Sequence, residues 1–323
     1  WMCGTDDPRG YDDSALPLLL QYCRQPPHQI QALRLLQTAI ESSCGGGAAL
    51  LTAPWLQQRS YYDSSAAEGQ QNCWSDEEDE RHKQLPSSSE LPSPGSQPIS
   101  RTFAPNNINK IVKLFLTLVP EELRSSNSDD FESYKTDAVR QYQELVRVSS
   151  LHNWGREAHA DVGSTGDSTS LCSRESPPED DTRHRFSPGP FLDMLLDLIQ
   201  GLPVQEYDVN LQVTCLVSCL ALLPHPHLHE YLLNPCLPVM AGVRTPYSVL
   251  RQVLTTATPA IVASPQHKEH LQLARQQLLG GLNTYEIRRD DQDRRFEAVI
   301  VMEEFCKELA SIAHAKYTVE LER

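Results

Sequence analysis

Apolar residues recur every three or four positions in successive segments of this chain, and no segment alternates between apolar and polar residues with a period of two. The first pattern is typical of amphipathic helices, and the second is typical of half-buried strands. Runs of β-branched residues bounded by glycine, which would indicate buried strands, are absent as well. The sequence therefore predicts an all-α fold.

The densest apolar patterns lie in the last part of the chain. Helices are expected there around 191–199, over 208–223, up to about Asn234, and over 247–256, 266–282 and 293–315. Short turns that contain proline separate them, which suggests stacked antiparallel hairpins, an α-solenoid of the HEAT or armadillo kind. Because no fixed sequence repeat is found, the solenoid prediction depends on the length and order of the helices alone.

Composition divides the chain into five parts. Hydrophobic residues make up 39 % of it, below the share of about 45–50 % in ordinary globular proteins, and the shortage falls in two polar stretches. We expect a short helical segment over 1–56, an acidic, Ser/Pro-rich disordered linker over 57–105, a helical hairpin of the solenoid over 106–150, a disordered insert over 151–189 and a carboxy-terminal helical solenoid domain over 190–317.

The predicted linker contains a candidate phosphorylation site. Ser75 directly precedes the acidic run 76–80, a setting that suits acidophilic kinases. A phosphate on Ser75 would add about −1.5 to −2 charges. The alternative is a solvated linker without a regulatory role.

Charge and cysteine content narrow the function classes. The chain has 28 basic and 43 acidic residues, a net charge of −15, and no basic stripe, which argues against tight binding to nucleic acid or to anionic lipid. The longest uncharged apolar run, 211–223, is shorter than the roughly 20 residues of a membrane-spanning helix. Nine cysteines without a framework spacing are typical of a reducing compartment. We expect a cytoplasmic protein without a transmembrane segment.

One constellation resembles a metal or thiol site. Cys215 and Cys219 are four residues apart on a predicted helix, and His225, His227 and His229 follow shortly after it. Zinc prefers Cys and His ligands, so a zinc- or thiol-dependent enzyme is one interpretation. The other is that the cysteines are small apolar residues of a packed helix and that the histidines belong to a helix-capping turn.

A cluster of acids on the final helix could imitate a pair of catalytic carboxylates. Glu303, Glu304 and Glu308 surround Lys307, and this arrangement is more typical of a solvated helix face. The same acids would raise the pKa of Cys306, so that thiol is expected to be inert. Phosphate-binding, zinc-protease and serine-hydrolase motifs are absent from the sequence. These patterns indicate neither an enzyme nor a cofactor.

Three runs in the last part of the chain resemble the FTS- and Hook-interacting protein family. They are residues 207–214 (YDVNLQVT), 224–233 (PHPHLHEYLL) and 302–313 (MEEFCKELASIA), in order and with plausible spacing. The resemblance covers about 190–316, and a weaker similarity runs over 109–144. Members of the family are longer, so we expect this chain to be a carboxy-terminal portion.

The resemblance implies an α-solenoid without enzymatic activity. It implies a subunit of a complex with a Hook-family microtubule-motor adaptor and with FTS, a catalytically inactive ubiquitin-conjugating-like protein. Such a complex connects dynein to endosomes or other vesicles through a Rab-class GTPase, which places the protein in the cytoplasm and peripherally on vesicles. An unrelated HEAT-like transport scaffold is a further alternative.

No catalytic residue can be assigned from the resemblance. Candidate partner-binding residues within the matching runs are Asp208, Asn210, His225, His227, Glu230, Tyr231, Glu303 and Glu304. Most of them also have a structural interpretation, since Asp208 or Asn210 could cap a helix and His225 could bind carbonyl groups at a turn. We favour the structural interpretation for all of these residues except the exposed glutamates.

Overall fold

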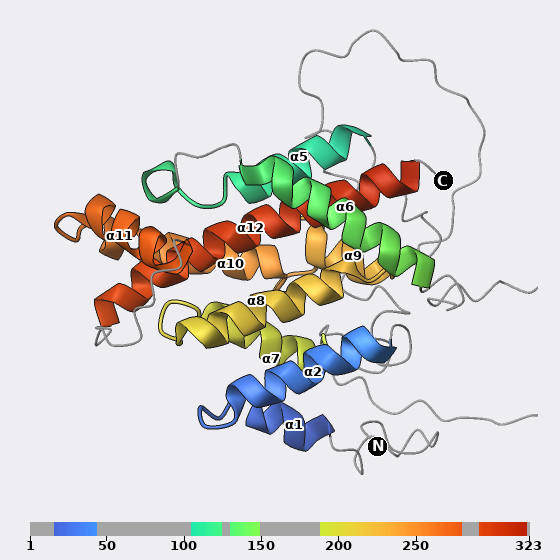
Figure 1. Cartoon of the computed structure of the whole chain (residues 1–323), viewed down its shortest axis with the longest axis horizontal. Helices are drawn as coiled ribbons and strands as arrows, with labels where there is room; N and C mark the ends of the chain where they lie inside the picture. The colour runs from blue at the N-terminus through green and yellow to red at the C-terminus, as the bar shows by residue number, and fades with distance from the viewer. Residues whose placement is uncertain (1–15, 44–104, 125–129, 149–187, 280–290, 322–323) are drawn as a thin grey trace, which may run out of the picture.

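The computed structural model describes residues 16–43, 105–124, 130–148, 188–279 and 291–321, and these residues confirm the all-α prediction. They form ten α-helices and one short 3-10 helix, with no β-strand among them (Figure 1). Ser75 and almost all of the predicted linker (57–105) and insert (151–189) lie outside the described residues.

The helices keep the numbers shown in Figure 1. They are α1 (Leu16–Tyr22), α2 (Gln29–Ser43), α5 (Pro105–Leu116), η2 (Glu121–Leu123), α6 (Asp130–Val148), α7 (Gly189–Gln200), α8 (Tyr207–Leu222), α9 (Pro226–Leu233), α10 (Pro246–Val262), α11 (His267–Leu279) and α12 (Asp291–Leu321). Among these helices, none combines the length and the apolar character that a membrane span requires.

Two helices extend further than their sequence patterns predicted. The predicted end of α10 was Thr256, but the helix continues through Pro259 to Val262 and buries Ile261. The predicted end of α12 was Ala315, but the helix continues to Leu321 and buries Lys316 and Val319. In both cases, packing against other helices stabilises turns that local propensity does not favour.

Helices α2 and α8 lie side by side and run in the same direction. Near their starts, the Arg34 Nε donates to the Gln212 side-chain oxygen at 3.4 Å. Near their ends, the Cys219 Sγ donates to the Glu41 Oε1 at 3.5 Å. Because residue numbers rise together along both helices, the pair is parallel.

The same direction continues through α12 to α6. Lys316 on α12 reaches the carbonyl groups at the end of α8. Tyr134 on α6 donates to Glu304 near the middle of α12, and Tyr142 donates to Glu320 near its end at 3.5 Å. Helices α2, α8, α12 and α6 therefore form one layer, which we call the parallel layer (Figure 1).

The spatial order of this layer differs from the order of the chain. Helices α5 and α6 precede α7 in the sequence, yet both pack against α12 (Figure 1). The helix that lies next to α2 is α8 and not α6. In three hairpins, α1–α2, α7–α8 and α11–α12, the second helix belongs to the layer. Consecutive stacking of hairpins along the chain, as first expected, is thus interrupted by α5 and α6.

The interpretation of one face of the final helix as solvated is wrong. Glu303 is only 4 % exposed, Lys307 is buried as well, and Glu304 and Glu308 are partly buried. Most of the helix is buried on every side, because α5, α6, α8 and α11 all pack against it. The acids and Lys307 therefore make contacts inside the protein.

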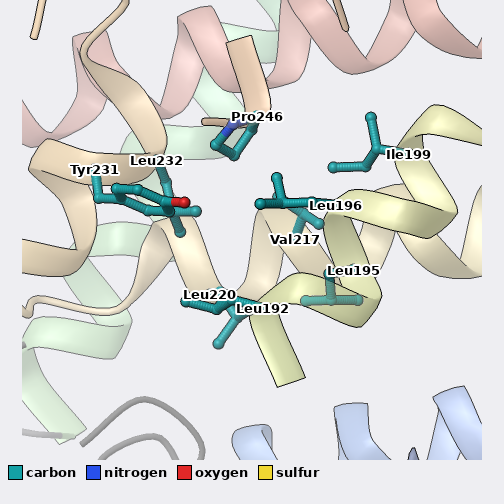
Figure 2. Close-up of a pocket in the computed structure, with 9 residues that line it drawn as sticks. All are labelled: Leu192, Leu195, Leu196, Ile199, Val217, Leu220, Tyr231, Leu232 and Pro246. Atoms are coloured by element: carbon teal, nitrogen blue, oxygen red, sulfur yellow. The ribbon is translucent and has the colours of Figure 1, made fainter. Parts of the chain in front are cut away.

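Figure 2 shows an apolar seam where α7, α8, α9 and the first turn of α10 meet. Its lining residues are Leu192, Leu195, Leu196, Ile199, Val217, Leu220, Tyr231, Leu232 and Pro246. The cavity between them has a volume of only about 10 Å³. Since one water molecule needs about that much space, the seam belongs to the packed core and holds no ligand.

Candidate functional site

A buried ionic network occupies the middle of α12. Glu303 accepts a hydrogen bond from the Arg275 guanidinium of α11 at 2.6 Å, and the Lys307 Nζ lies 3.7 Å from its other oxygen. Arg275 also donates to the carbonyl oxygen of Leu123 at 2.6 Å. The network thus joins α11, η2 and α12, and a buried carboxylate is stabilised by two cations.

Glu304 continues the network toward α6. It accepts a hydrogen bond from the Tyr134 hydroxyl and another from the Lys307 Nζ at 2.8 Å. Its side chain is about a quarter exposed (26 %). The structure therefore brings together two of the three predicted partner-binding glutamates, Glu303 and Glu304, and engages both in contacts between helices.

Lys316 is fully buried at the junction of three helices. Its Nζ donates to the carbonyl oxygens of Leu222 at 3.2 Å and Leu223 at 2.8 Å, and it lies 4.4 Å from the centre of the Tyr142 ring. Burial lowers the pKa of Lys316 to about 7, although the nearby Glu320 raises it. A neutral amine can still donate to both carbonyls, so the lysine caps the end of α8 in either protonation state.

Glu230 and Tyr231 on α9 are also buried. Tyr231 is 1 % exposed, and its hydroxyl donates to the backbone oxygen of Arg244. Arg244 in turn binds Asp193 at 3.1 Å and Asp197 at 2.8 Å on α7. This arrangement fixes the segment between α9 and α10 onto α7, and it leaves Tyr231 without a surface for a partner.

Asp208 and Asn210 occupy the start of α8, but neither caps it. The residue at the capping position is Glu206, whose side chain makes no capping hydrogen bond. Asp208 is exposed in the first turn. Asn210 is buried, donates to the Leu202 carbonyl at 2.9 Å and accepts from Gln205 at 3.1 Å, so it holds the turn between α7 and α8.

The histidine turn after α8 caps the start of α9, as one of the two interpretations predicted. The Nδ1 of His225 accepts a hydrogen bond from the backbone N–H of Leu228 at 3.4 Å, whereas the sequence suggested that it would bind carbonyl groups. The side chain of His227 lies outside the described part of the chain.

Cys215 and Cys219 are half-buried on α8, where it packs against α2. The contact with Cys215, burial and the nearby Glu41 all raise the pKa of Cys219. Burial likewise raises the pKa of Cys306 to about 12. Among the described residues, no group of three or more His, Cys, Asp or Glu side chains has an arrangement that could hold a metal ion. The described residues therefore give no support to the zinc site of the alternative interpretation.

A recess of the described surface lies along α10, and we call it the α10 groove. It has a volume of about 550 Å³. One side is the segment between α9 and α10, and the other is the first three turns of α10. Its lining residues are Asn234, Pro235, Leu237, Val239, Thr245, Tyr247, Ser248, Arg251, Gln252, Thr255 and Thr256. A recess of this size is in the range of ligand-binding clefts.

The capping box of α10 forms one end of this groove. The Thr245 hydroxyl accepts from the Ser248 N–H at 3.2 Å, and the Ser248 hydroxyl accepts from the Thr245 N–H at 2.8 Å. Pro246 follows at the first helical position, where its fixed backbone angle suits a helix start. The sequence T-P-Y-S therefore sets the position of Tyr247 and of the whole wall of the groove.

Two family models match this chain. One, described as a family of unknown function (DUF5917), matches residues 188–281, which contain α7 to α11. The other, the KELAA motif, matches residues 290–321, which contain α12. The chain carries Lys307, Glu308, Leu309 and Ala310 in this stretch, followed by Ser311, whose hydroxyl donates to the Glu308 backbone oxygen at 2.8 Å.

Several residues of these sites were missed by sequence reasoning. Arg275 and Arg251 lie on helices that the apolar pattern predicts, but this pattern gives no information about the partners of a cation. For Lys316 a signal existed. It follows Phe305, Leu309 and Ile312 on the same apolar stripe, at a spacing of four from Ile312. A cation on such a stripe indicates a buried charge with a specific partner.

Proposed function

We propose that this chain is a non-enzymatic scaffold subunit of a complex with a Hook-family adaptor and FTS. In this proposal the complex connects dynein to endosomes or other vesicles, through a Rab-class GTPase. The support comes from the resemblance of residues 207–214, 224–233 and 302–313 to the FTS- and Hook-interacting protein family. These three runs fall on α8, α9 and α12, which pack together in one body.

The observation that carries the proposal is the parallel layer. In α-solenoids the equivalent helices of successive hairpins lie side by side in one direction, and their exposed faces form extended binding surfaces. The second helices of α1–α2, α7–α8 and α11–α12 are arranged in this way. We therefore propose a solenoid-like stack in which α5 and α6 are placed out of sequence order against α12.

The buried positions of the shared residues refine this proposal. Four of the shared residues are buried: Asn210, Glu230, Tyr231 and Glu303. We infer that they are shared with the family because they stabilise the fold. The residues that contact partners would then lie on exposed parts of the surface, where the α10 groove is the strongest candidate.

The experiment is a pulldown of the tagged full chain from cells, followed by mass spectrometry. We expect Hook and FTS proteins to be recovered with the wild-type chain and with Arg140→Glu, a surface variant of α6. We expect Phe305→Asp to lose both, because it buries an unpaired carboxylate in the core. Recovery of neither protein by a chain shown to be folded would contradict the proposal.

Metal content and localisation of the tagged chain test the two alternative functions. Zinc at about one equivalent per chain would favour the zinc-dependent enzyme built on Cys215 and Cys219. A tagged chain found at the nuclear rim instead of on vesicles would favour an unrelated HEAT-like transport scaffold. Localisation to cytoplasmic vesicles supports the adaptor function.

A further inference from the structure

We propose that the α10 groove binds an extended peptide segment in which an acidic side chain neighbours an apolar one. The inference deepens the proposed scaffold function and rests on it for its biological meaning. The groove has an apolar floor, hydrogen-bonding groups on its wall and one positive charge.

The floor of the groove is apolar and fixed in place. Leu237 is buried there, and Val239 and Tyr247 are partly buried. The Tyr247 ring packs edge-to-face on Phe115 of α5, with ring centres 5.5 Å apart and planes at 88°. Because α5 supports the ring from behind, the floor needs little rearrangement to receive an apolar side chain, which reduces the entropic cost of binding.

The wall of the groove offers both acceptors and donors to a peptide backbone. The hydroxyl protons of Thr255 and Thr256 are donated within α10, to the backbone oxygens of Arg251 at 2.7 Å and Gln252 at 2.9 Å. Each oxygen keeps lone pairs that can accept a hydrogen bond from a ligand. The Gln252 side chain is exposed and can both donate and accept. An extended peptide presents N–H and C=O groups alternately, and this wall can bind both.

The positive charge of Arg251 favours an acidic ligand in the groove. Arg251 is the only charged residue among those that line it, and no carboxylate is present there, although the whole chain has a net charge of −15. Arg251 is exposed and forms no ion pair with another residue of the described ranges. Burial raises the pKa of Tyr247 and Arg251 partly offsets this effect, so the positive charge acts at the floor of the groove.

A carboxylate beside an apolar side chain satisfies both features at once. Its oxygens would bind the Arg251 guanidinium, while the neighbouring side chain covers Tyr247 and Leu237. A nucleic acid fits less well, because tight binding of phosphates needs several cations and this groove has one.

The test is fluorescence anisotropy with the purified full chain and a short fluorescein-labelled peptide of alternating leucine and glutamate. The matched probes are the same peptide with glutamine for glutamate and a labelled oligothymidine. We expect the glutamate peptide to bind, the glutamine peptide to bind about tenfold more weakly, and the oligothymidine not to bind. Arg251→Glu should reduce affinity for the glutamate peptide by at least about tenfold.

The matched control variant is Arg140→Glu, which reverses an exposed arginine on α6 outside the groove. It should leave the affinity for the peptide unchanged, and thermal melts should show that both variants are folded. Equal affinity for the two peptides, equal effects of the two variants, or a preference for oligothymidine would each overturn the inference. If the peptide fails to bind a chain that still recovers Hook and FTS, only this inference fails. If it binds a chain that recovers neither, only the proposed function fails.

Discussion

The Lys316 Nζ lies 2.8 Å from the carbonyl oxygen of Leu223, which follows the last residue of α8. This contact joins the two central helices of the parallel layer at a point that is fully buried. The last carbonyl groups of a helix have no partner within it, and here a side chain from a distant segment supplies one.

The first prediction concerns pH. Burial lowers the pKa of Lys316 to about 7 in the folded chain, whereas an unfolded lysine has a pKa of about 10.4. Between these values the unfolded state binds more protons, so this residue makes the free energy of unfolding rise with pH from about 7 to 10. In Lys316→Met, chemical denaturation at several pH values should show no such rise.

Other groups titrate in the same range, so the decisive quantity is the difference between wild type and variant. Lys316→Arg is the matched control, because arginine stays charged and should lack the rise as well. Curves for wild type and Lys316→Met that run parallel from pH 7 to 10 would show that Lys316 does not titrate there.

The second prediction concerns the ionic network. Arg275→Met removes the guanidinium that lies 2.6 Å from the buried Glu303 carboxylate, and we expect a loss of about 3 kcal/mol in the free energy of unfolding. Adding Glu303→Gln should recover part of the loss, because the buried negative charge that Arg275 neutralises is then absent. Urea denaturation of the two single variants and the double variant measures the coupling, and additive effects would exclude a direct pair.

The third prediction compares a buried and an exposed residue of the run 207–214, which resembles the family. Asn210→Ala removes the hydrogen bond to the Leu202 carbonyl and the one accepted from Gln205, and it should cost about 1–3 kcal/mol. Asp208→Ala, two residues earlier and exposed, should change stability by less than about 0.5 kcal/mol. Melting curves of the two variants measure both losses of stability. A larger loss for Asp208→Ala than for Asn210→Ala would contradict the assignment of Asn210 as structural.

The fourth prediction tests the packing of α12. Phe305 is 2 % exposed, so Phe305→Ala should cost about 3–5 kcal/mol. Leu273 on α11 is 53 % exposed, and Leu273→Ala should stay within about 0.5 kcal/mol. Calorimetry that finds equal effects for the two substitutions would contradict the burial of this face.

Local signals predicted some elements well. The stretch 106–150, which was expected to be helical, contains α6 and nearly all of α5, and acidic residues mark the start of α6 while apolar spacing marks its course. The predicted short helix that ends near Asn234 is α9, which ends at Leu233. In these elements, neighbouring residues hold the information that decides the structure.

Contacts between distant segments could not be predicted in this way. The charges of Glu303 and Lys307 looked solvated, because the partner Arg275 lies on another helix and α5 and α6 come from before the insert. The α10 groove forms where the segment after α9 folds back beside α10, and no periodicity indicates that Asn234 and Thr256 line one recess.

The most direct test of the scaffold function uses purified components. The full chain would be mixed with purified FTS and a Hook-family adaptor and passed over a size-exclusion column with light scattering. The scaffold function predicts one peak that contains all three proteins, with a mass equal to a defined sum of theirs. A folded chain that elutes at its own mass, apart from both partners, would contradict it.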